Sequence, residues 1–309
     1  MQGQVQTVKA AQTLKEPSGW QSFARSEFFF KYKRSATAII GSIITISVLL
    51  IAIFGPFFTV QNPYDMTNID LSDAYKPPAW IQGGELRFPL GTDQQGRDIL
   101  SAIVYGSRVS LLIGLVGALF ASIVGVTLGL ASGYFGGKVD AFIMRLADIQ
   151  LSFPTMLIAL FLMSFFGRGI RNILIALCLV GWVSYARTVR GETLSVKKKE
   201  YIEATRVIGL PNFMILFKHV LPNVFTSILV LSTIQVGTFI LTEATLSFLG
   251  LGVPVTRPSL GMLCDNGFKV LYSGLWWVSI FPGLYIVMIV FGINLLGDFL
   301  RDELNPKLK

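Results

Sequence analysis

Six long apolar runs, separated by ionisable residues, constrain the fold of this 309-residue chain more than any other feature. They lie at 35–64, 109–137, 149–167, 172–186, 220–242 and 270–297. A bilayer core about 30 Å thick needs about 20 apolar helical residues to cross it. Only 14% of the residues are charged, whereas soluble domains carry about 25%. The runs therefore predict an all-α integral membrane protein with six transmembrane helices.

The six runs do not fit straight spans equally well. The fourth is short, and it needs Arg171 or Arg187 to extend its side chain toward the lipid headgroups. The third contains Pro154, which predicts a kink or an irregular start. In the first, Pro56 and the polar residues that follow it place the helix at 36–58.

The basic residues are distributed unevenly between these runs. With the N-terminus placed inside, 18 Lys and Arg fall in inner segments and 8 in outer segments. Short cytoplasmic loops of membrane proteins carry such an excess, so we expect both termini in the cytoplasm. The same rule explains the formal net charge of +8, and no nucleic-acid partner is needed to account for it.

These positions divide the chain into segments. We expect a cytoplasmic N-terminal segment at 1–35, a first helix at 36–58, an extracytoplasmic loop at 59–104, a core of five helices at 105–298 and a cytoplasmic tail at 299–309. The mixed aromatic and basic residues at 20–34 fit an interfacial helix on the inner leaflet or, equally well, a basic flanking tail. The proline- and glycine-rich loop 59–104 is expected to have little regular structure.

The second run carries a stripe of small residues. They recur at every fourth position, at Gly117, Ala121, Gly125, Gly129 and Gly133. Such a stripe lets another helix backbone approach closely in lipid, either within the chain or at a subunit interface. We favour packing within the same chain.

The inner loop at 187–222 is long and has a helical pattern. Residues 196–208 predict a helix that Gly209 interrupts, and Pro211 suits the first turn of a second helix. At Gly209 we expect a turn in which a side chain would clash. Such an elbow would give another protein a rigid contact to the helices on either side, although many inner loops are helical.

Several motifs resemble one family. Glu203, Ala204, Gly209 and the pair Leu221-Pro222 resemble the EAA loop of ABC importer permeases, with Thr205 in place of its third alanine. The stretches at 91–114, 133–140, 246–254 and 297–308 look like the C-type inner-membrane subunit of the dipeptide, oligopeptide and nickel subfamily.

The resemblance implies a type I ABC importer permease fold in a bacterial or archaeal plasma membrane. It implies three kinds of partner: a second related permease subunit, two cytoplasmic ATPases that bind ATP and Mg²⁺, and an extracytoplasmic binding protein. Glu203, Ala204, Thr205 and Gly209 would form the element that couples the chain to an ATPase. The cargo would be a dipeptide, a longer peptide, a glutathione-like molecule or a nickel chelate, and the sequence does not choose among these.

Two charged positions outside the inner loop are candidate contacts. Glu243 lies within the fifth run, where a carboxylate is costly unless it faces protein or water. It is expected to line the pathway and to contact cargo, or else to cap a neighbouring helix or lie near the outer surface. Arg257 and Asp265 follow in an outer loop, where they contact the binding protein or are simply solvated.

The sequence gives no sign of chemistry within the chain. The only histidine is His219, and two cysteines do not make a cluster, so we expect no metal site. The stretch 132–140 resembles a phosphate-binding loop but has Ser132 and Val139 at two positions that the motif requires. We therefore expect a transport subunit without an ATPase site or cofactor of its own. An ion-gradient-driven transporter or channel is the alternative, and it would not need the elbow.

Overall fold

The computed structural model describes residues 27–304, apart from 66, 68, 255–256 and 258. Over this part the regular structure is helical, and it is joined by one isolated antiparallel bridge between Thr92 and Asp98. The long helices are α3 (Ala36–Phe54), α4 (Ile99–Phe135), α5 (Gly137–Leu151), α6 (Thr155–Phe166), α7 (Ile170–Val196), α10 (Leu221–Phe248) and α12 (Trp277–Leu304). The short ones are α2 (Glu27–Arg34), η1 (Gly55–Phe57), η3 (Leu71–Asp73), α8 (Glu200–Val207), α9 (Asn212–Met214), the π-helical turn η4 (Ile215–Val220), α11 (Leu260–Phe268) and η5 (Leu271–Ser273).

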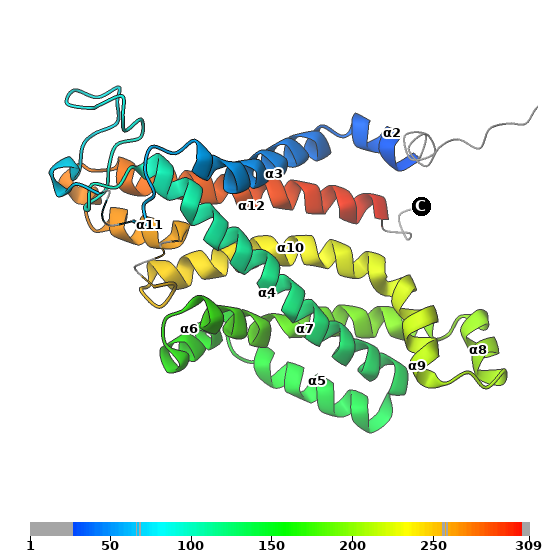
Figure 1. Ribbon diagram of the computed structural model, residues 1–309. Coiled ribbons are helices and arrows are strands. Elements are labelled where there is room, and N and C mark those ends of the chain that lie inside the picture. The colour runs from blue at the N-terminus through cyan, green and yellow to red at the C-terminus, as the bar shows by residue number, and fades with distance from the viewer. Residues whose placement is uncertain (1–26, 66, 68, 255–256, 258, 305–309) are drawn as a thin grey trace, which may run out of the picture.

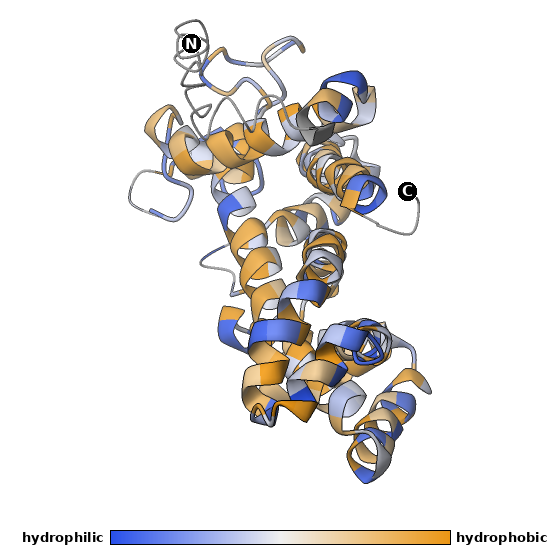
Figure 2. Ribbon diagram, turned by 90° about the vertical axis from the view of Figure 1, so that its right-hand side faces the viewer, coloured by the Kyte–Doolittle hydropathy of each residue, from blue (hydrophilic) through white to orange (hydrophobic). Residues whose placement is uncertain are grey.

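The long helices lie side by side and give the molecule two distinct ends (Figure 1). We call the end with residues 59–98 and α11 the loop end, and the end with α8 and α9 the elbow end. Both α2 and the last turns of α12 lie at the elbow end. Figure 2 shows the molecule from the elbow end. Hydrophilic residues lie at many of the helix ends, and hydrophobic residues predominate along the rest of the helices.

Five helices are long and apolar enough to cross a membrane, and α5 with α6 makes a sixth if that bent pair is one span. The pair bends by 88° at Ser152, Phe153 and Pro154. The kink predicted at Pro154 is therefore confirmed. Because α4 finishes at the elbow end and α7 starts at the loop end, α5 and α6 together carry the chain between the two ends.

The fourth predicted span is not short, which corrects the expectation from the sequence. Its helix, α7, has 27 residues and continues through Arg187 and Arg190. Both arginines are paired with acids on α5, Arg187 with Asp148 and Arg190 with Asp140. Ionisable residues therefore do not mark the end of this helix, because each is paired with an acid of the neighbouring helix α5.

The small-residue stripe of α4 packs mainly against α7 of the same chain. A Cβ atom added at Gly125 would lie 2.4 Å from the Trp182 carbonyl oxygen, and one at Gly129 would lie 2.6 Å from that of Ala186. Such distances leave no room for a side chain. The prediction that the stripe serves packing within the chain is confirmed.

The loop end is more ordered than the sequence suggested. Asp93 and Arg97 form a nearly fully buried ion pair at 2.7 Å. Asp98 caps α4 by accepting a hydrogen bond from the Ser101 backbone N–H at 2.8 Å. The helix therefore begins at Ile99, five residues before the predicted end of the loop at 104. The motif at 91–98 consequently serves to start and anchor α4.

Candidate functional site

The predicted elbow is present at the end of α7, but its first helix is shorter than expected. Instead of one helix at 196–208, α7 ends at Val196 and α8 begins at Glu200 after a break at Lys197–Lys199. At its far end, α8 closes with two backbone hydrogen bonds, from Gly209 N to Arg206 O and from Leu210 N to Thr205 O. This pair of bonds is a Schellman motif, which stops a helix sharply.

Glycine is favoured at position 209 because of its backbone conformation, and not because a side chain there would lack space. Its φ angle is +83°, in the left-handed region that favours glycine. A Cβ atom there would meet nothing within 4 Å, so the expected clash is wrong. The glycine sets the direction in which the chain leaves α8 toward α9.

The structure separates the four predicted coupling residues. Glu203, Ala204 and Gly209 are exposed, whereas Thr205 is buried. The Thr205 hydroxyl donates a hydrogen bond of 2.6 Å to the carbonyl of Ile202, which is itself fully buried. Thr205 therefore replaces the family's alanine on the inner face of α8, and it does not belong to the outer contact surface.

Large apolar side chains are exposed around the tip of the elbow. Val207 is 88%, Ile208 76% and Phe213 71% exposed, and the Phe213 ring lies 4.4 Å from that of the exposed Phe217. We call these four residues the apolar elbow surface. Grouped exposed apolar residues mark interaction sites. The sequence motif indicated Glu203, Ala204, Thr205 and Gly209, and none of these four belongs to this surface.

Tyr134, near the end of α4, holds the elbow in place and was also not predicted. Its carbonyl accepts a hydrogen bond of 2.5 Å from Lys197, and its hydroxyl donates one of 2.8 Å to the Asn212 side chain. The Arg206 guanidinium lies 5.0 Å from the centre of its ring, within the range of a cation–π contact. One buried tyrosine thus connects α4 to the end of α7, to α8 and to α9. We call it the elbow anchor.

The stretch that resembles a phosphate-binding loop has a structural role. It forms the end of α4, a turn with positive φ at Gly136 and Gly137, and the start of α5. Asp140 accepts two hydrogen bonds from Arg190, both of 2.6 Å, and a third from Ser132. These bonds join α4, α5 and α7 at the elbow end.

Glu243 lies in a fully buried group of hydroxyls near the loop end of α10. It accepts hydrogen bonds from Ser110 at 2.8 Å and from Ser247 at 2.7 Å, and Ser259 lies 3.2 Å from Ser247. The side chain is 0% exposed, so it lines no open pathway in this conformation. Among the described residues its partners are serine hydroxyls and not backbone N–H groups, so it does not cap a neighbouring helix either. Glu243 instead links α10 to α4 and, through Ser247 and Ser259, to the start of α11.

A cavity of about 650 Å³ lies between α7, α10 and α12 toward the elbow end. Hydroxyl and amide side chains line much of it, among them Thr188, Asn223, Thr226 and Ser227, together with Glu192 and Arg301. Within the residues that the structure places, no three His, Cys, Asp or Glu side chains are arranged to hold a metal ion. The cavity is therefore lined by hydrogen-bonding and charged groups from three helices.

These features define a class of protein: a multi-pass helical membrane protein with an elbow that projects from one end of the helical bundle and a polar cavity between its long helices. Comparison with known proteins gives the family. A profile described as binding-protein-dependent transport system inner membrane component matches residues 125–309, and one for the N-terminal transmembrane domain of oligopeptide transport permease C matches 20–78. The chain belongs to this family of inner-membrane permease subunits.

Curated relatives align over almost the whole chain. The dipeptide transport system permease protein DppC of Alkalihalophilus pseudofirmus is 40% identical and covers 92% of this chain and 90% of its own. The oligopeptide transport system permease protein OppC of Bacillus subtilis is 39% identical, with 90% and 88% covered. The glutathione transport system permease protein GsiD of Pectobacterium atrosepticum is 36% identical, with 92% and 91% covered.

The fold has a solved counterpart. A chain of the MetNI methionine ABC transporter, in an inward-facing conformation, aligns with a TM-score of 0.54 at 21% identity. The alignment covers 66% of this chain and 96% of that one. Together the comparisons support a permease subunit of an ABC importer, and they do not support the alternative of an ion-gradient-driven transporter or channel.

Proposed function

We propose that this chain forms half of the translocation pathway of an ATP-driven importer for short peptides. A second, related permease subunit forms the other half, and an extracytoplasmic binding protein delivers the cargo. The relatives named for dipeptide, oligopeptide and glutathione transport support a peptide cargo, since glutathione is itself a small peptide. The polar cavity between α7, α10 and α12 supports a solute pathway on this side of the chain.

In this proposal the chain crosses the plasma membrane six times, with the elbow end in the cytoplasm. The α5–α6 pair counts as one bent crossing, which agrees with its carrying the chain between the two ends. The positive-inside rule supports the orientation, because the basic residues of α2, those around α8 and Arg301 in the last turn of α12 all lie at the elbow end.

The elbow is proposed to dock on one of two cytoplasmic ATPases, with Glu203, Ala204 and Gly209 on the contact side. The observation that carries this proposal is the apolar elbow surface, with side chains 44–88% exposed on an element fixed by Tyr134. Exposed apolar groups at the cytoplasmic end of a membrane protein gain from burial against a partner. The exposed Glu203 adds a charge that a basic partner group would pair with.

ATP and Mg²⁺ are proposed to bind to the partner ATPases and not to this chain. The chain's own nearest match to a phosphate-binding loop is built into the α4–α5 turn, where Asp140 and Arg190 are already paired. The permease then contributes no bond-breaking chemistry. Its task is to change conformation when the ATPases move the elbow.

A charge reversal at Glu203 tests this proposal. In proteoliposomes with the complete complex, Glu203→Arg is expected to lower peptide transport about tenfold or more, because a charge-assisted contact is lost. ATP hydrolysis is expected to persist. Asp302→Arg is the matched control, since Asp302 is an exposed acid at the elbow end outside the elbow. Unchanged transport in Glu203→Arg would refute the coupling role.

A further inference from the structure

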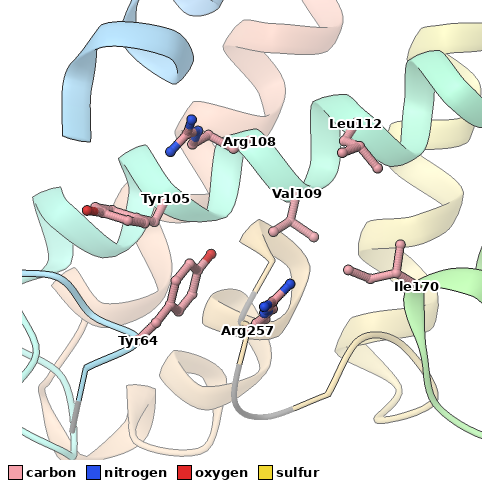
Figure 3. Close-up of a pocket in the computed structure, with 7 residues that line it drawn as sticks. All are labelled: Tyr64, Tyr105, Arg108, Val109, Leu112, Ile170 and Arg257. Carbon is pink, nitrogen blue, oxygen red and sulfur yellow. The ribbon is translucent and has the colours of Figure 1, made fainter. Parts of the chain in front are cut away.

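A second hollow, of about 530 Å³, lies at the loop end (Figure 3). Tyr105 and Arg108 border it from α4, and Tyr64 and Arg257 reach it from two loops that are far apart in sequence. Its volume is within the range of about 300–1,000 Å³ typical of small-molecule sites. In the orientation proposed above, this hollow faces the extracytoplasmic side, where cargo arrives.

The hollow carries two positive charges and no acid. Its lining residues include Arg108 and Arg257 but no Asp or Glu. Elsewhere at the loop end, Lys76, Arg97 and Lys269 each form an ion pair with a carboxylate. Within the part of the chain that the structure covers, Arg108 and Arg257 have no such partner. Two guanidinium groups around one space repel each other, and an anion between them relieves that repulsion.

Neighbouring groups add to the preference for an anion. The first residue of α7, Ile170, lines the hollow, and the cap residue Gly169 provides no side-chain hydrogen bond to the helix. The N-terminus of a 27-residue helix therefore presents its positive end here. Burial raises the pKa of Tyr64 to about 12, although both arginines act in the opposite direction. The phenol thus stays neutral at physiological pH and remains a hydrogen-bond donor.

The remaining wall is apolar. Val109 and Leu112 of α4 and Ile170 of α7 form it, and the Tyr64 and Tyr105 rings pack edge to face at 5.2 Å. A ligand that fits must therefore combine an anionic group with an adjacent apolar or neutral part. A short peptide with a free C-terminal carboxylate has this combination.

We propose that Arg108 and Arg257 bind the C-terminal carboxylate of the cargo as it enters the permease from the binding protein. The inference rests on the proposed peptide cargo and adds a specific subsite to it. Lipid headgroup phosphates are the other anions near this position, since Arg108 lies close to the start of a membrane-spanning helix. Cargo is favoured because Tyr64 and Arg257 belong to loops and not to the spans.

The test compares a dipeptide with the same dipeptide amidated at its C-terminus. Transport is measured in proteoliposomes that contain the complete complex with its binding protein. Each variant rate is divided by the wild-type rate for the same cargo, which cancels any preference of the binding protein. Arg108→Gln and Arg257→Gln are each expected to slow transport of the free acid about tenfold and of the amide less than twofold. Arg108→Lys is expected to recover part of the loss.

Arg87→Gln is the matched control, because Arg87 is an exposed arginine of the loop that also contains Tyr64 and it does not line the hollow. It is expected to leave both rates unchanged. If the binding protein rejects the amide, titration of both peptides onto the solubilised complex without binding protein gives the same comparison.

Three results would overturn the subsite. Equal losses for acid and amide would indicate a docking or folding role for the arginines. A loss that depends on the anionic lipid content of the vesicles would indicate a headgroup site. Normal transport of both peptides by the variants would remove any role in transport. A wild-type complex that carries neither peptide would instead contradict the proposed function itself, and the subsite with it.

Discussion

The buried carboxylate of Glu243 lies where α4, α10 and the start of α11 meet. From sequence alone it could be assigned to the pathway, to cargo or to a cap, because a single acid in an apolar run fits all three. Its hydrogen-bond partner Ser110 is 133 residues away in sequence, so no local pattern reveals the pair. Only the fold brings the serines together around it.

Glu243→Ala is predicted to destabilise the protein by about 2–4 kcal/mol, since it leaves buried hydroxyls unpaired and opens a cavity. Glu243→Gln keeps the size and one acceptor oxygen, so it is predicted to cost less. Thermal inactivation of the detergent-solubilised complex measures both. A variant that stays fully stable but no longer transports peptide would show instead that Glu243 acts in the pathway.

The predicted coupling residues show which features of the elbow can be inferred from the sequence. The end of the helix at Gly209 was predicted correctly, because helix C-termini have a local sequence signature. The reason for it differs from the expected clash, since positive φ is a property of the backbone. The burial of Thr205 and the exposure of Phe213 depend on how α8 and α9 pack, and a motif does not contain that information.

Among the elements, the third and fourth spans show the limits of reading apolar runs. Long apolar helices lie at five of the six runs, and the bent α5–α6 pair covers the remaining one, because hydrophobic length is a strong signal. The bend between α5 and α6 was anticipated from Pro154, yet its 88° angle depends on packing against other helices. The length of α7 was underestimated because the partners of Arg187 and Arg190 lie on another helix.

The contact between α4 and the elbow gives a prediction at this scale. Tyr134→Leu removes the ring beneath Arg206 and the hydrogen bond to Asn212, whereas Tyr134→Phe removes only the hydrogen bond. Both are expected to loosen the elbow, so that more ATP is hydrolysed per peptide transported. The ratio is predicted to rise about threefold or more for leucine and less for phenylalanine, in line with contacts worth about 0.5–2 kcal/mol each.

The ratio of ATP hydrolysed to peptide transported, measured in proteoliposomes, tests the anchor directly. Tyr272→Leu serves as the control, because Tyr272 is 91% exposed at the opposite end of the molecule. If Tyr134→Leu lowers only the yield of assembled complex and leaves the ratio unchanged, Tyr134 supports folding and does not transmit motion.

At the scale of the whole molecule, the elbow continues directly into two long helices. α7 leads into it, and α10 follows it through the π-helical turn at Ile215–Val220. Pro222 at the start of α10 lacks a backbone N–H, which fits the widened turn just before it. A force on the elbow therefore reaches α10 through continuous helix from α9, and it reaches α7 across the three-residue break at Lys197–Lys199.

The helical architecture could be predicted from the sequence more fully than the candidate contact and binding sites. Long apolar runs, charge asymmetry and family motifs can all be read along the chain. The apolar elbow surface, the elbow anchor and the hollow at the loop end each combine residues from distant segments, such as Tyr64 and Arg257. Their chemistry becomes visible only after folding brings those residues together.

A site-specific photo-crosslinker at Ile208 is the most direct test of the central claim, that a separate ATPase drives the elbow. In the membrane-embedded complex, Ile208 is predicted to crosslink to the ATPase subunit, with a yield that changes when ATP binds. A crosslinker at Phe161, which is exposed on α6, is predicted to give no ATPase product. If Ile208 crosslinks only to lipid or to nothing while the same complex still imports peptide, the account is contradicted.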